Sequence, residues 1–179
     1  MMEERQNKRS HGAREAALYG MLIALAFIFS YVESLFPMPV PIPGVKLGLA
    51  NLVSVVGLYT VGAPGTAVVS LLRIVMVGFT FSNPGSMLYS LSGGVLSLIV
   101  MILMKKSGGF SKVGVSVAGG IFHNIGQLGM AAFITGTAGV FAYLPVLLVA
   151  GVVTGSVIGL LGGLIVERIS PVAARMRDR

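Results

Sequence analysis

The sequence predicts an all-α integral membrane protein, a single bundle of six transmembrane helices. Hydrophobic residues make up 55% of its 179 residues and charged residues only 11%, and the mean hydropathy is +0.91. A soluble domain has a far larger share of charged residues. Five of the six acidic residues also lie near the two ends of the chain, so the long central stretches suit lipid rather than water.

Six apolar runs define the predicted helices, because a helix needs about 20 apolar residues to cross a bilayer. They cover residues 16–36, 47–61, 63–81, 86–104, 113–134 and 144–166. The second run is short and nearly abuts the third, which predicts a tight helical hairpin and leaves open a five-span alternative that merges or loses one of the two. The first run is longer than the apolar core of a signal peptide and no small-x-small cleavage site follows it, so we expect it to be retained.

Lysine and arginine placement distinguishes six spans from five, since cytoplasmic loops are enriched in these residues. Eleven of the thirteen precede the first run, lie between the fourth and fifth runs, or follow the sixth. Six spans bring these three regions to one side of the membrane, and five cannot. The sequence therefore predicts a transmembrane domain at 16–169 between a basic N-terminal segment, 1–15, and a basic tail, 170–179, with both ends in the cytoplasm.

The sequence lacks the residues that several classes of function require. The basic residues lie at membrane edges rather than on one soluble surface, so we expect no nucleic-acid partner. The chain has no cysteine and only two histidines, far apart in sequence, so we expect neither a metal site nor a bound cofactor. It has no GxxxxGK[ST] loop for ATP, and no two carboxylates are spaced for acid/base hydrolysis.

The first outer loop carries prolines at positions 37, 39, 41 and 43. Each proline fixes φ and removes an amide donor, which predicts an extended and fairly stiff apolar segment. Two interpretations stay open. The segment is either a lid over the outer mouth of the bundle or a rigid connector.

Polar residues within the runs mark a candidate binding site, because an ionisable side chain in hydrocarbon is costly unless it faces a partner or a wet cavity. With the predicted orientation, nearly all of them lie between the middle of the membrane and its outer surface. The candidate substrate-binding residues are Glu33, Lys46, Asn51, Arg73, Tyr89, His123, Asn124 and Gln127. His123 and Gln127 are four residues apart and share a helix face.

The cations in this set outnumber its one carboxylate, which favours an outward-opening pocket for a small molecule with anionic or acceptor-rich groups. A purely structural alternative also stays open. In it, Arg73 pairs with Glu33 as a buried ion pair, and the polar residues of the fifth run make hydrogen bonds between helices.

Small residues recur at four-residue spacing in two of the runs. Ala16, Gly20 and Ala24 form one such ridge, and the other is Gly151, Gly155, Gly159 and Gly163. Ridges of this kind let helix backbones approach closely in lipid. The first ridge suits docking of a partner membrane protein, and the second suits packing inside the bundle.

Five strings carry a resemblance to a known family. They are SYVESLFPMPVPIPGVKLGLANLV, SLLRIVMVG, LYSLSGGVLSLIVM, GVSVAGGIFHNIGQL and YLPVLLVAGVVTGSVIGLL. The resemblance covers about residues 17–169. The chain resembles the bacterial family described as heptaprenyl diphosphate synthase component I, also called the Gx transporter family. That family is similar to the six-helix S components of energy-coupling factor (ECF) transporters. The resemblance implies an S-component-like fold in the bacterial cytoplasmic membrane.

The two family labels imply different functions. As an S component, the protein would be the substrate-binding subunit of an importer for a vitamin or cofactor precursor, with a coupling membrane subunit docked on Ala16, Gly20 and Ala24 and with separate ATPases. As component I, it would be a non-catalytic subunit for heptaprenyl diphosphate or menaquinone biosynthesis beside a catalytic subunit. Prenyl synthases hold Mg²⁺-diphosphate with DDxxD motifs, and the one aspartate here is Asp178, so we expect no such catalysis. The importer is the expected function and the synthase subunit the alternative; a membrane scaffold without ligand is a third.

Overall fold

The computed structural model describes the backbone of residues 2–35 and 48–177, and this part of the chain is helical without strands. The elements are α1 (Met2–Leu35), α2 (Asn51–Thr60), α3 (Gly62–Thr80), α4 (Pro84–Ser107), α5 (Lys112–Thr135), the 3₁₀ helix η1 (Ala138–Tyr143) and α6 (Leu144–Arg177). The all-α prediction is confirmed.

Five stretches of these helices are long and apolar enough to cross a membrane. They are Glu15–Leu35, Gly62–Thr80, Pro84–Ser107, Lys112–Thr135 and Ala138–Ile169. The third, fourth and fifth predicted runs agree with α3, α4 and α5 to within three residues at each end. The chain is therefore a multi-pass membrane protein.

The predicted second transmembrane helix, 47–61, is corrected by the structure. Helix α2 has only 10 residues, so it is about 15 Å long, half of the roughly 30 Å hydrocarbon core. It starts late because Gly48 has φ +85°, a left-handed conformation that glycine readily adopts, and a turn at residues 49–50 follows. In the described part, five long helices and one half-length helix replace the six predicted spans.

Local sequence sets the ends of α4 and α5. The Asn83 side chain accepts a hydrogen bond from the Ser86 amide at 2.8 Å, and Pro84 occupies the first helical turn, where its missing amide is harmless. Ser111 caps α5 in the same way through the Gly114 amide at 3.1 Å. Gly108 ends α4 in a left-handed conformation.

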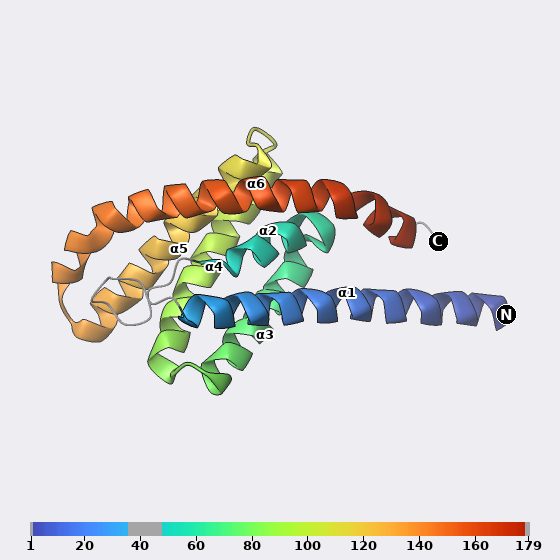
Figure 1. Cartoon of the computed structure of the whole chain (residues 1–179), viewed down its shortest axis with the longest axis horizontal. Helices are drawn as coiled ribbons and strands as arrows, with labels where there is room; N and C mark the ends of the chain where they lie inside the picture. The colour runs from blue at the N-terminus through green and yellow to red at the C-terminus, as the bar shows by residue number, and fades with distance from the viewer. Residues whose placement is uncertain (1, 36–47, 178–179) are drawn as a thin grey trace.

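The start of α1 and the end of α6 lie at the same end of the bundle (Figure 1). The connection between α2 and α3 lies toward that end, and contacts join the α4–α5 connection to it, since Lys105 Nζ donates to the Leu58 carbonyl oxygen of α2 and Lys112 pairs with Glu167 late in α6. The α3–α4 turn and the passage from α5 into η1 lie at the opposite end. This arrangement agrees with the even number of passages that the basic residues predicted. We call these the terminal end and the turn end of the bundle.

The outer surface of the described helices is apolar, unlike that of a soluble protein, and several polar side chains are buried. Phe79 and Phe133 are 82% and 83% exposed, whereas Gln127 is fully buried and His123 is only 4% exposed. Large apolar side chains also cover the outside of every long helix. Lipid is therefore the solvent of the outer surface, and polar groups turn inward.

Close backbone contacts join α6 to α5 along the ridge of the last helix. A Cβ at Gly151 would lie 3.1 Å from the Gly120 carbonyl oxygen, at Gly155 2.7 Å from Val117 Cα, and at Gly159 2.7 Å from Val113 Cα. No side chain fits in such spaces without moving a helix. This ridge therefore packs inside the bundle.

Candidate functional site

Helix α4 packs between α3, which carries Arg73, and α5, which carries three of the other predicted site residues. Its paired glycines let both neighbouring helices approach closely: a Cβ at Gly93 would lie 2.7 Å from the His123 carbonyl oxygen on α5, and one at Gly94 would lie 3.3 Å from Ile74 Cδ1 on α3. Arg73 lies on the side of α4 that faces α3. The polar residues of α5 lie on the side of α4 that faces α5. The sequence predicted one pocket for both groups.

Glu33 joins the start of α2 to α1. Its Oε1 accepts hydrogen bonds from the backbone amide of Gly48 and, at 3.4 Å, from that of Leu49. These amides precede α2, where a helix leaves N–H groups without acceptors and where its dipole favours a negative charge. Glu33 is only 4% exposed. The carboxylate therefore acts as a cap for a helix that begins inside the bundle.

Arg73 has an incomplete set of partners. Its Nη1 donates to Ser30 Oγ at 3.3 Å, and its Nε is buried without a hydrogen-bond acceptor. The Glu33 carboxylate is near enough to act on it electrostatically while one of its oxygens accepts from the backbone before α2. The structural alternative of a simple Glu33–Arg73 ion pair therefore does not describe all contacts of these residues.

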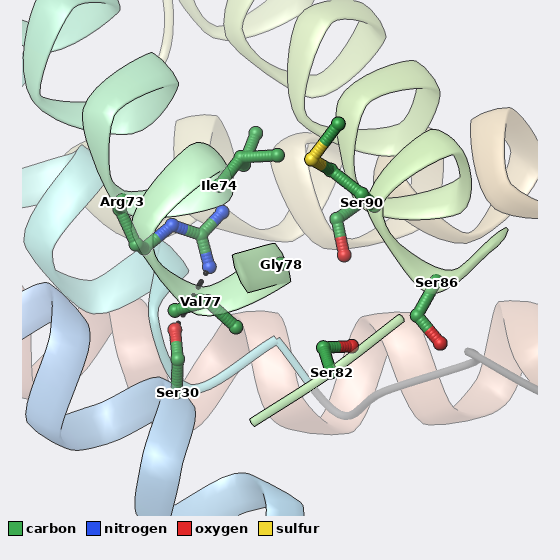
Figure 2. Close-up of a pocket in the computed structure, with 9 residues that line it drawn as sticks. Ser30, Arg73, Ile74, Val77, Gly78, Ser82, Ser86 and Ser90 are labelled. Atoms are coloured by element: carbon green, nitrogen blue, oxygen red, sulfur yellow. Dashed lines mark hydrogen bonds between the residues drawn. The ribbon is translucent and has the colours of Figure 1, made fainter. Parts of the chain in front are cut away.

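A cavity adjoins the Arg73 guanidinium between α1, α3 and α4 (Figure 2). It measures about 240 Å³ when the part that is open to the surroundings is counted, and its enclosed part has room for about one water molecule. The lining residues are Ser30, Arg73, Ile74, Val77, Gly78, Ser82, Ser86, Met87 and Ser90. The cavity runs from the middle of α3 to the α3–α4 turn, so it belongs to the turn end of the bundle.

Sequence reasoning missed the four serines of this cavity. Ser82, Ser86 and Ser90 are four residues apart, and this spacing would have placed their hydroxyls on one side of the start of α4. Ser30 lies one turn before Glu33 on α1. Figure 2 shows the Ser90 hydroxyl across the cavity from Arg73 and Ser30. The site thus combines one cation with several neutral hydroxyls.

The polar residues of α5 form the second group. Asn124 Nδ2 donates to the Leu147 carbonyl oxygen of α6 at 2.7 Å, which joins these two helices. His123 and Gln127 contact the Gly93 region of α4. Asn51 and His123 both approach Gly48, so the start of α2 meets α5 here. All four side chains are at most 8% exposed.

Three further predictions concern Tyr89, Lys46 and the proline segment 37–43. Tyr89 packs in an apolar cluster with Leu128, Ala131 and Leu147 rather than beside the Arg73 cavity. Lys46 and the proline segment 37–43 lie outside the described residues, so the lid and the connector both stay predictions.

The small-residue ridge of α1 faces away from the bundle. Ala16, Gly20 and Ala24 are exposed, and a Cβ added at Gly20 would meet nothing within 4 Å. This contrasts with the ridge of α6, which is filled by α5. The α1 ridge is free to contact lipid or another membrane helix.

Fold and site together define a multi-pass helical membrane protein with a buried polar interior. An arginine and four serines surround a cavity on one side of α4, and an amide and imidazole group lies on the other.

The chain belongs to the heptaprenyl diphosphate synthase component I family, whose sequence model matches residues 22–165. The resemblance to this family is confirmed, and the similarity to S components stays a prediction. A search of curated proteins and a search of solved structures each found no significant match.

Proposed function

We propose that this protein is a non-catalytic membrane subunit of heptaprenyl diphosphate synthesis that works beside a separate catalytic subunit. The observation that carries the proposal is the family match over residues 22–165. The sequence supports a non-catalytic role, because its single aspartate cannot form the carboxylate clusters that hold Mg²⁺-diphosphate. Of the functions expected from the sequence, the family description favours this one over the importer.

The terminal end of the bundle offers a surface for a soluble partner. Helices α1 and α6 have 34 residues each, so each is about 51 Å long and exceeds the roughly 30 Å hydrocarbon core. Their extra turns lie at the terminal end, where the α4–α5 connection with Lys105, Lys106 and Lys112 also lies. By the positive-inside rule this end faces the cytoplasm. A soluble prenyl synthase would reach the protein there.

Copurification tests this proposal. The full chain in detergent would be captured together with a candidate catalytic subunit, a soluble prenyl diphosphate synthase with DDxxD motifs from the same organism. We expect a stable complex and a changed rate or product chain length in the presence of the membrane subunit. Absence of the complex, with unchanged products, would contradict the proposal.

A second function, the substrate-binding subunit of an ECF-type importer, is favoured by one observation. The Arg73 cavity belongs to the turn end, which the positive-inside rule places outside the cell. A site open to the outside suits capture of a solute better than contact with a cytoplasmic enzyme. The exposed ridge of Ala16, Gly20 and Ala24 would then contact the coupling subunit.

The ridge gives this second function its own test. Gly20→Leu adds a side chain where nothing lies within 4 Å, so folding should be unaffected while a helix docked on the ridge is pushed away. We expect copurification with a coupling subunit and its ATPases to be lost in this variant. The matched control is Gly129→Leu, because Gly129 on α5 also has nothing within 4 Å of its Cβ position but lies outside the ridge. If neither the original protein nor the control binds a coupling subunit, the importer is excluded.

A further inference from the structure

We infer that the Arg73 cavity binds a phosphoryl group, a tetrahedral oxyanion that forms one end of a phosphorylated ligand. The inference goes beyond both proposed functions by naming the anion that this cavity binds, and it rests on the first proposed function only for the choice of a prenyl diphosphate as a probe.

The unused hydrogen-bonding capacity of Arg73 points to a missing acceptor. A guanidinium has five N–H donors, and one hydrogen bond to Ser30 together with a buried Nε that has no acceptor leaves it far from saturated. Arg73 is only 8% exposed, and a charge inside a membrane bundle is costly until a partner completes it. A bound anion would supply the acceptors.

The lipid-embedded part of the sequence offers few acids to take this place. No aspartate or glutamate occurs between Glu33 and Glu167. Glu33 acts on Arg73 electrostatically, but its Oε1 accepts from the amides of Gly48 and Leu49 and Arg73 Nε stays without an acceptor among the described residues. Glu167 pairs with Lys112 at 3.2 Å on the exposed surface of the terminal end. The acceptor for Arg73 is therefore best supplied by a ligand.

The hydroxyls select a phosphoryl group over a carboxylate. Ser30 comes from α1, Ser82 from the α3–α4 turn, and Ser86 and Ser90 from α4, so donors reach the cavity from several directions. A carboxylate has two oxygens in one plane, which the planar guanidinium alone can pair. A phosphoryl group has further oxygens out of that plane, and these would accept from the serines.

The start of α4 adds a favourable field. Ser86 lies in the first turn of this 24-residue helix, where the positive end of the helix dipole favours an anion. The enclosed space is small, so the Met87 side chain must swing aside for a phosphoryl group to enter. Met87 crosses in front of Gly78, where a Cβ would lie only 2.7 Å from its Sδ, and methionine changes rotamer easily. The rest of the bound ligand would extend out of the cavity through its open part.

Thermal unfolding of the purified full chain in detergent tests the inference with three probes. Farnesyl diphosphate carries both a diphosphate and a prenyl chain, inorganic pyrophosphate carries only the anion, and farnesol carries only the chain. We expect farnesyl diphosphate to raise Tm and farnesol to leave it unchanged. A comparable rise with pyrophosphate would support the phosphoryl site but identify its ligand as a soluble phosphate compound.

Variants separate binding from folding. Arg73→Met should weaken farnesyl diphosphate binding at least tenfold while the ligand-free protein stays folded, because in the described part of the chain Arg73 makes one hydrogen bond, to Ser30, and its Nε has no acceptor to lose. Ser90→Ala should weaken binding without affecting the fold. Lys112→Met is the control, since it removes a cation at the opposite end of the bundle and should leave the ligand-induced shift intact.

The outcomes that overturn the inference differ from those that overturn the proposed function. No shift with either phosphorylated probe, or an unchanged shift in Arg73→Met, would refute the phosphoryl site. Loss of the catalytic-subunit complex with an intact Arg73-dependent shift would refute the proposed function alone. A ligand-free Arg73→Met protein with a strongly lowered Tm would assign Arg73 to structure and would also refute the site.

Discussion

Single residues decide how the polar interior is organised, and Glu33 is the clearest case. The sequence marks it as exceptional, since it is the only acid between Glu15 and Glu167. Its partners could not be read from the sequence, because the amides of Gly48 and Leu49 belong to a turn that depends on the positive φ of Gly48. A backbone turn inside a membrane bundle needs such an acceptor, as unsatisfied amides there cost several kcal/mol.

Replacement of Glu33 should therefore destabilise the protein. Glu33→Ala leaves the two amides before α2 without their acceptor, at a cost of about 1–3 kcal/mol for each buried group. Glu33→Gln keeps a carbonyl oxygen in place and should cost less. Thermal unfolding in detergent measures both changes. Equal stability of Glu33→Ala and the original protein would show that the cap contributes nothing.

Part of the candidate site could be predicted from the sequence. Arg73, His123 and Gln127 stood out because polar side chains are rare in these runs, and all three are buried. Their division by α4 could not be predicted, since it depends on the close approaches of Gly93 to α5 and of Gly94 to α3. The serines could not be singled out from the sequence, because hydroxyl side chains are common in membrane helices and carry no charge.

At the scale of helices, α5 and α6 pack with their backbones close together. The four-residue glycine spacing predicted a close approach, and the structure supplies the partner: Gly120, Val117 and Val113 of α5 lie against Gly151, Gly155 and Gly159 of α6 in that order. The hydrogen bond from Asn124 to Leu147 extends the contact toward the start of α6. Short van der Waals contacts replace the hydrophobic effect as the force that holds these helices together in lipid.

A bulky residue in this contact should separate the two helices. In Gly155→Leu the first added carbon alone would lie 2.7 Å from Val117 Cα, so the backbones must move apart. Overpacking of this kind costs about 1–3 kcal/mol, and more when backbone is the obstacle. The control is Gly129→Leu on α5, which meets nothing within 4 Å. We expect a lowered Tm for the first variant only, and equal Tm values would contradict the assigned helix contact.

At the scale of the whole molecule, hydropathy and basic residues predicted the long helices and the gathering of both ends at one end of the bundle (Figure 1). They did not predict that α2 covers only half of the membrane, because its apolar run continues through Gly48, where the backbone turns. Composition predicts which segments lie in lipid. The length of a helix also depends on single residues at which the helix begins or ends. Which end faces the cytoplasm stays a prediction from charge.

Cysteine labelling in intact cells would determine this orientation, and the chain has no native cysteine that would also be labelled. Ala138→Cys lies at the turn end, at the start of η1, and Gly109→Cys lies in the α4–α5 connection; both sites are exposed. We expect a membrane-impermeant maleimide to label Ala138→Cys in intact cells and Gly109→Cys only after lysis. The reverse pattern would place the Arg73 cavity on the cytoplasmic side. It would then remove the observation that favours an importer and leave the cavity accessible to a ligand made by a cytoplasmic prenyl synthase.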